Sequence, residues 1–174
     1  MLENRSYLLS RKYRVLLCIL YILLEITHAA ENCTTCRQCP AGWPRMGDSC
    51  YFVSVLKANW YGAKHACENM GSHLATLQTF FEDMFVSIYL RNIQNHLTDA
   101  FYIWMGGSDL NKEGEWKWVT GEPFSFTNWR KEVTNGQIQA PDNFIEHCLD
   151  WSNGWNDNNC YTEYHFICEK DLCV

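Results

Sequence analysis

Two helix-like patterns in the first half of the chain, short aromatic segments in the second half and a high cysteine content predict a disulfide-bonded α+β domain. The 174 residues are enough for one domain with its own hydrophobic core. Aromatic residues make up 15% of the sequence, so we do not expect disorder. The net charge of −6 and the absence of a basic stripe argue against a nucleic-acid partner.

Residues 1–29 have the composition of a secretory signal peptide. Four basic residues precede an unbroken apolar run from Val15 to Leu24, and small residues follow at Ala29 and Ala30. The run is shorter than the roughly 20 residues that span a bilayer, although the long basic flank leaves a signal anchor as the alternative. We therefore expect a secreted, extracellular protein.

The cysteines predict a disulfide framework. Cys18 lies in the apolar run, and nine cysteines remain after cleavage, a density typical of an oxidising compartment. Because nine is odd, at least one thiol stays free or pairs outside the chain. The CxxC spacing within 33–39 could bind zinc, but in a secreted chain disulfides are the stronger interpretation.

The elements are expected in the following order. Residues 30–38 form a short polar lead-in, and a hairpin tied by Cys39 and Cys50 follows. Apolar residues at helical spacing predict a helix over 59–70, with Asn59 as N-cap and Gly71 as its stop. A short run at 74–77 is expected to be buried.

A capping box formed by Thr79 and Glu82 predicts the start of a second helix. We expect its apolar stripe to face the core, and the stripe comprises Phe81, Phe85, Ile88 and Tyr89. FYIWMGG, WKWV and HFICEK then predict strands. The long stretch rich in Gly, Pro, Asn and Thr between Trp118 and Cys148 predicts a functional loop.

The chain resembles the long form of the C-type lectin domain over residues 39–170. The resemblance rests on an ordered set of segments, namely CPAGW, SCY, WMGGSD, GEWKWV, NW, EHC, GWND and HFICE. It implies two helices packed on small antiparallel sheets, with a long loop that binds the ligand. It also implies three disulfides, Cys39–Cys50, Cys67–Cys168 and Cys148–Cys160. Cys33, Cys36 and, in the tail 171–174, Cys173 lie outside this pattern, so we expect extra pairing and a disulfide-linked homodimer.

The resemblance places a calcium site in the long loop, with Asp142, Glu146, Asn156 and Asp157 as ligands. Carboxylate and amide oxygens are the ligands that calcium prefers. Pro141, in a position that is typically cis in this family, turns the chain sharply before Asp142. The residue before that proline is normally Glu or Gln, whereas here Ala140 has no side-chain oxygen, so calcium binding is either weakened or lost.

The expected sugar-binding residues overlap with these ligands and are Asp142, Phe144, Glu146 and Asn156. Asp142 corresponds to the galactose-type form of the motif, and the ring of Phe144 could stack on the apolar face of galactose or pack inward. An auxiliary calcium site is implied at Asp109, Glu113 and Asn143, but His147 stands where a carboxylate is common. A plain turn explains Asp109 and Glu113 equally well.

Two functions are consistent with this sequence. One is a calcium-dependent lectin that binds glycans, acting in innate recognition. The alternative is a module of the same fold that binds mineral or protein and not sugar. An enzyme is not expected, because the six histidines are scattered and no nucleophile or metalloprotease motif is present.

Overall fold

The computed structural model describes residues 38–94, 102–131, 133–134, 137–138, 140–141 and 145–172. Residues 39–172 form one compact unit. The expected signal peptide and Cys33, Cys36 and Cys173 lie outside the described residues. Among the described helices, none is long and apolar enough to cross a bilayer.

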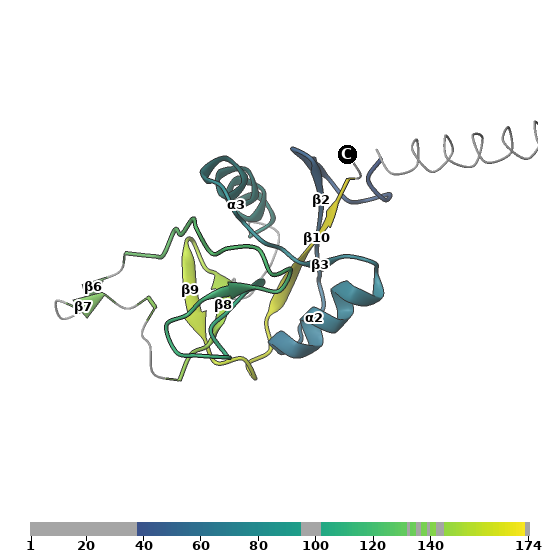
Figure 1. Cartoon of the computed structure of the whole chain (residues 1–174). Coiled ribbons are helices and arrows are strands. Elements are labelled where there is room, and N and C mark those ends of the chain that lie inside the picture. The colour runs from purple at the N-terminus through teal and green to yellow at the C-terminus, as the bar shows by residue number, and fades with distance from the viewer. Residues whose placement is uncertain are drawn as a thin grey trace, which may run out of the picture. The chain divides into compact units, whose positions relative to one another are not determined.

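The described residues of this unit form two helices and ten short strands (Figure 1). In chain order the elements are β1 (Arg45–Met46), β2 (Ser49–Val53), α2 (Trp60–Asn69), β3 (His73–Leu74), α3 (Phe80–Gln94), β4 (Ile103–Ser108), β5 (Lys117–Trp118), β6 (Val133–Thr134), β7 (Gln137–Ile138), β8 (Cys148–Trp151), β9 (Trp155–Asn158) and β10 (His165–Asp171). The predicted α+β class is confirmed, and the segments expected to be strands become β2, β4, β5 and β10.

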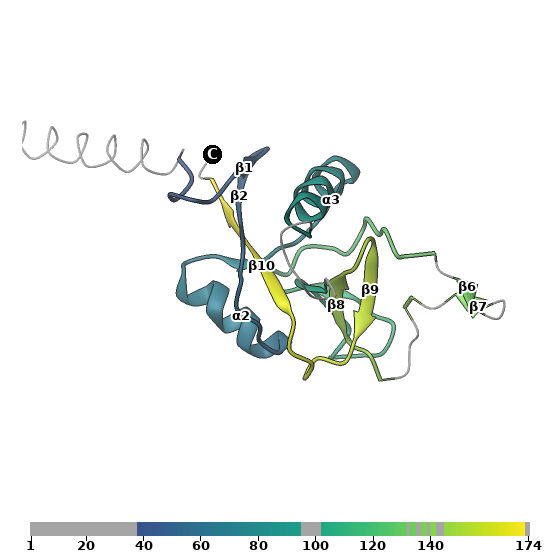
Figure 2. The same ribbon diagram turned by 180° about the vertical axis from the view of Figure 1, so that it is seen from behind.

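Strand β10 lies at the centre of the main sheet. It pairs antiparallel with β2 and β3 and parallel with β4, so one pairing departs from the antiparallel arrangement expected. Strand β4 then pairs with β8, and β8 pairs with β9. The two views show α2 and α3 on opposite sides of β10 (Figures 1 and 2). The small β6–β7 ladder lies in the long loop, beyond β8 and β9.

Helix α2 forms as the sequence predicts. The side chain of Asn59 accepts a hydrogen bond from the Gly62 amide at 2.8 Å, which satisfies one free donor of the first turn. Trp60, Ala63 and Cys67 form its buried face. Gly71 follows the helix with a φ of 64°, a conformation that glycine adopts without steric cost.

The expected core stripe of α3 is wrong except at Tyr89, which is partly buried and packs against the core. Phe81 is 66% exposed and Phe85 48% exposed, and Ile88 is also exposed. The buried face instead comprises Asp83, Val86, Ser87 and Leu90. This face is preferred because the core presents indole N–H groups, which need acceptors. Trp155 donates to Asp83 at 2.7 Å, and Trp151 donates to Ser87 at 2.9 Å.

The predicted capping box forms only in part. The Glu82 amide donates to Thr79 Oγ1 at 3.2 Å, but the Glu82 carboxylate accepts from the Gln78 amide at 2.7 Å and not from Thr79. Its other oxygen accepts from the hydroxyl of Tyr51 at 2.9 Å. Glu82 therefore links the start of α3 to strand β2.

The three implied disulfides are all present, as Cys39–Cys50, Cys67–Cys168 and Cys148–Cys160. Cys67–Cys168 connects α2 to β10 and closes a segment of 101 residues. Cys148–Cys160 connects the start of β8 to the turn that follows β9. The Cys148–Cys160 bridge therefore fixes the strands at the base of the long loop.

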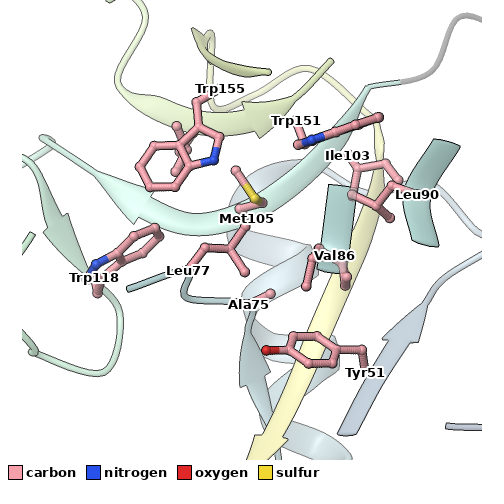
Figure 3. Packing of buried hydrophobic residues seen from close by; sticks show 12 residues of the cluster. Tyr51, Ala75, Leu77, Val86, Leu90, Ile103, Met105, Trp118, Trp151 and Trp155 are labelled. Atoms are coloured by element: carbon pink, nitrogen blue, oxygen red, sulfur yellow. The ribbon is translucent and has the colours of Figure 1, made fainter. Parts of the chain in front are cut away.

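The core is rich in aromatic side chains (Figure 3). Trp151 and Trp155 are fully buried, and the ring of Trp155 makes an edge contact with that of Trp118 at a centroid distance of 5.5 Å. Strand β4 crosses this core with so little clearance that a Cβ on Gly106 would lie 2.6 Å from the backbone oxygen of Leu74. Glycine at this position is therefore a packing requirement.

Candidate functional site

The β8–β9 hairpin carries Asn156 and Asp157, two of the residues that the sequence placed in one calcium site, and Glu146 lies just before β8. In its ladder Leu149 lies opposite Asp157, and Asp150 lies opposite Asn156. Asp157 and Asn156 are both buried, and Glu146 is half-buried just before β8. The hairpin register, braced by Cys148–Cys160, is what positions these oxygen donors.

Arg130 lies beside this hairpin, which the sequence did not predict. Its guanidinium donates to Asn156 Oδ1 at 3.3 Å and to Ser152 Oγ at 3.2 Å. The Arg130 amide also donates to the Trp155 carbonyl at 2.8 Å, so the backbone of the loop is tied to β9. An amide oxygen has two lone pairs, so Asn156 Oδ1 can accept from Arg130 and still offer one lone pair to a cation.

Asp150 is a second residue that sequence reasoning missed. It is fully buried, and its Oδ2 accepts from the side-chain amide of Asn156 at 3.1 Å and from that of Asn158 at 3.4 Å. Burial raises the pKa of this carboxyl to about 7, and the amide hydrogen bonds only partly oppose the rise. Its Oδ1 has no hydrogen-bond partner among the described residues, so the hairpin holds a buried oxygen suited to a cation.

Helix α3 anchors the base of the hairpin through Asp83. One carboxylate oxygen accepts from Trp155 Nε1 at 2.7 Å, and the other accepts from Asn128 Nδ2 at 2.8 Å. Burial raises the pKa of Asp83, whereas these two hydrogen bonds lower it. Asp83 thus connects α3, β9 and the start of the long loop. These contacts hold β9, which carries the candidate site residues, in place.

The auxiliary residues Asp109 and Glu113 also come together, and His147 joins them. His147 Nδ1 lies 3.0 Å from Asp109 Oδ1 and 3.3 Å from Glu113 Oε2. The three ligand atoms all lie within 4.8 Å of one another, an arrangement able to hold a metal ion. The sequence placed His147 here as a departure from the expected pattern and not as a ligand.

Three predicted site residues, Asp142, Asn143 and Phe144, lie outside the described residues. The peptide bond between Ala140 and Pro141 is cis, as the resemblance implied. Ala140 is only 2% exposed, so the position that normally supplies an oxygen ligand is filled by a buried methyl group.

A family model of the lectin C-type domain matches residues 56–170, which is more than half of the chain. The chain belongs to the C-type lectin family. Perlucin from Haliotis laevigata is 39% identical over 140 residues, which cover 76% of this chain and 83% of perlucin. This agrees with the segments from which the resemblance was inferred.

Solved structures of C-type lectins and lectin-like proteins share the fold. The mouse scavenger receptor C-type lectin carbohydrate-recognition domain superimposes with a TM-score of 0.63 and 31% identity, covering 78% of this chain and all of that domain. A calcium-independent type II antifreeze protein superimposes with a TM-score of 0.62 and 25% identity, covering 78% of this chain and 96% of the antifreeze protein. The same fold therefore includes a carbohydrate-recognition domain and a calcium-independent antifreeze protein.

C-type lectin domains generally bind calcium, and the donors described here fit that ion in kind. Glu146, Asn156 and Asp157 supply carboxylate and amide oxygens, and the buried Asp150 Oδ1 is a further oxygen in the same hairpin. Ala140 supplies no side-chain oxygen, so this C-type lectin has one ligand fewer than the family pattern. These donors are of the kind that calcium binds, but the protein supplies fewer of them than in the family pattern.

Proposed function

We propose that this C-type lectin is a secreted, calcium-dependent carbohydrate-binding protein and not an enzyme. The observation that carries the proposal is the β8–β9 hairpin, which holds Asn156 and Asp157 on β9, with Glu146 just before β8. Calcium takes about six to eight oxygen ligands, so the four expected protein ligands leave positions open. Two neighbouring hydroxyls of a sugar fill such positions and accept or donate hydrogen bonds with the same side chains.

Calcium binding is tested first by thermal unfolding, with calcium and with chelator. Binding to the native state alone stabilises it by about 2.7 kcal/mol at a calcium concentration 100 times the Kd. Asp157→Asn removes one ligand charge and should abolish the calcium-dependent rise in Tm. Asp171→Asn, at the exposed end of β10, is the matched control and should keep it. Equal melting temperatures of the wild type with calcium and with chelator would refute calcium binding.

Ala140→Glu provides a complementary gain-of-function test. The substitution supplies the missing carboxylate at the position that the family uses for a ligand, and one added oxygen ligand should tighten calcium binding. Because Ala140 is buried, the variant must first be shown to fold in chelator. Binding to a glycan array, with and without calcium, then shows whether tighter calcium binding is accompanied by stronger sugar binding.

We further propose a preference for galactose or N-acetylgalactosamine over mannose. It rests on Asp142 after Pro141 and on Phe144, whose ring could cover the apolar face of galactose while the sugar hydroxyls bind calcium. Removing that face from water contributes about 25 cal/mol per Å². Free galactose should therefore compete better than free mannose for a galactosylated surface, and Phe144→Ala should reduce galactose binding. Stronger inhibition by mannose would contradict this preference.

The alternative function is a matrix module that binds mineral or protein and not sugar. It is favoured by Ala140, which removes an oxygen from the sugar-binding position, and by the similarity to a calcium-independent antifreeze protein. A protein that binds no glycan in the presence of calcium but is retained on calcium carbonate would support it.

We also propose that the cysteines outside the family pattern, Cys33, Cys36 and Cys173, link two copies of the chain. Two of them can pair within one chain, which leaves one thiol for a partner. Electrophoresis of the secreted protein without reductant should show a dimer that reductant converts to monomer. Only monomer under both conditions would exclude the disulfide-linked form.

A further inference from the structure

Asp109, Glu113 and His147 meet where β4 ends and β8 begins. Asp109 follows β4, Glu113 lies in the turn after it, and His147 directly precedes β8. The imidazole Nδ1 of His147 is 3.0 Å from Asp109 Oδ1 and 3.3 Å from Glu113 Oε2. Two connections that are far apart in the sequence thus supply one nitrogen and two oxygen ligand atoms.

Neighbouring backbone groups fix the orientation of the Asp109 carboxylate. Its Oδ2 accepts from the Gly114 amide at 2.8 Å, which leaves Oδ1 directed at His147. The Asp109 amide donates to the His147 carbonyl at 3.2 Å, so the two residues are also joined through the backbone. Hydrogen bonds of this kind orient metal ligands before the ion arrives. The side chains of Glu113 and His147 are partly exposed, which gives an ion access from solvent.

The ligand types decide which ion suits the cluster. Calcium binds oxygen and needs about six to eight such ligands, whereas zinc binds histidine nitrogen and carboxylate oxygen in a tetrahedron. Ligands that lie about 2.0–2.1 Å from a tetrahedral zinc are roughly 3.4 Å from one another. The measured separations of 3.0 and 3.3 Å from His147 Nδ1 are close to that value. Three protein ligands and a water molecule would complete the tetrahedron.

We propose that Asp109, Glu113 and His147 form a zinc site, and that His147 makes this position selective for zinc over calcium. The family resemblance implies calcium here, with a carboxylate at position 147. The substitution of an imidazole for that carboxylate changes the preferred ion from a hard cation to a borderline one. The proposal does not depend on sugar binding or on calcium at the β8–β9 hairpin.

The experiment compares zinc and calcium binding by calorimetry, on the chain stripped with chelator and with free thiols alkylated. Alkylation prevents zinc from binding to Cys33, Cys36 or Cys173. Zinc is titrated into wild type, His147→Asp and the control His65→Ala, in millimolar calcium. His65 is also a partly exposed histidine paired with a carboxylate, Glu68, at 3.0 Å, but lacks a second acidic partner among the described residues.

Wild type and His65→Ala should bind one zinc ion with the same affinity. His147→Asp should bind zinc at least about 10-fold more weakly, because an aspartate oxygen replaces the imidazole nitrogen that zinc prefers. In chelator-treated protein without zinc, His147→Asp should bind one calcium ion more than wild type. An unchanged melting temperature in chelator shows that the variant is folded, and His147→Gln provides a second variant if it is not.

Several results would overturn the proposal. If wild type binds no zinc, His147 serves only as an ion-pair partner of the two carboxylates. Equal zinc affinity in wild type and His147→Asp would place the ion elsewhere on the chain. Displacement of the bound zinc from wild type by millimolar calcium would show that the histidine does not set the selectivity.

Discussion

Glu169→Gln tests a buried cluster in which two carboxyl groups share one hydroxyl. Tyr51 is fully buried, and its hydroxyl oxygen lies 2.9 Å from Glu82 Oε1 and 3.1 Å from Glu169 Oε1. A phenol has one hydrogen, so it can donate to only one of the two. The second contact is a hydrogen bond only if Glu169 is protonated and donates to the phenol oxygen.

The hydrogen bonds of Glu169 allow the size of the effect to be worked out. Its Oε2 accepts from the Thr76 amide at 2.8 Å and from the Thr76 hydroxyl at 3.3 Å. In Glu169→Gln the amide oxygen keeps both bonds, and the new NH₂ group donates to the oxygen of Tyr51. No hydrogen bond is lost, so at pH 5 the variant should differ from wild type by less than about 1 kcal/mol.

The pH dependence has a definite sign. Burial, and then the charge of Glu82, raise the pKa of Glu169, so the native state holds a proton that the unfolded state releases. The stability associated with that proton is complete below the ordinary glutamate pKa and is lost as pH rises through the raised pKa of the native state. Each unit of that rise corresponds to about 1.4 kcal/mol lost by pH 8. Glutamine does not titrate, so Glu169→Gln should lose less stability than wild type between pH 5 and pH 8.

The assay is urea denaturation at pH 5 and pH 8 in chelator. Asp150 and Asp83 also have raised pKa values, so each of them also reduces stability as the pH rises. Both residues are present in wild type and in the variant. The difference between the two pH profiles therefore isolates Glu169. Tyr51→Phe is the contrasting variant, because it removes the shared hydroxyl and should cost about 2–4 kcal/mol. Identical pH profiles for wild type and Glu169→Gln would refute the shared-proton arrangement.

Two further predictions concern stability. Replacing Cys67 and Cys168 by alanine should lower the free energy of unfolding by about 4–5 kcal/mol, because the bridge closes 101 residues, and a loss below about 1 kcal/mol would contradict the chain-entropy argument. Gly106→Ala should cost at least about 1–3 kcal/mol, since its Cβ would approach the Leu74 carbonyl to 2.6 Å. Gly62→Ala, within α2 and with its nearest contact at 3.3 Å, is the control and should be neutral or slightly stabilising in the same melts.

Elements whose sequence signals lie within one segment were predicted correctly. Predictions failed where a residue's contact partner lies far away in the sequence. Helix α2 was predicted correctly because its N-cap, Asn59, and its buried face lie within one segment. The face of α3 was predicted wrongly because Asp83 is buried by an indole 72 residues away, and nothing near Asp83 in the sequence indicates that partner. Large aromatic side chains at helical spacing, such as Phe81 and Phe85, mark a helix but do not say which face is buried.

The candidate site shows the same division. Asn156 and Asp157 were predicted as calcium ligands from their motif, and this role stays a prediction; the structure places both residues on β9. Arg130 and Asp150 were missed, because their contacts with Asn156 depend on the register of β8 against β9 and on the backbone bond from Arg130 to Trp155. His147 was noticed as a departure, but only the measured distances to Asp109 and Glu113 show that it completes a ligand set.

The central position of β10 sets the time at which this domain can fold during synthesis. Strand β10 is the last in the chain, yet β2, β3 and β4 all use it as a partner, and β2 precedes it by more than 100 residues. Pairings so distant in sequence are slow to form and expose unpaired strand edges until they do. While residues 165–171 are still inside the ribosome, the nascent chain can form its helices but cannot complete the main sheet. The aromatic core therefore stays accessible to chaperones until β10 has left the ribosome.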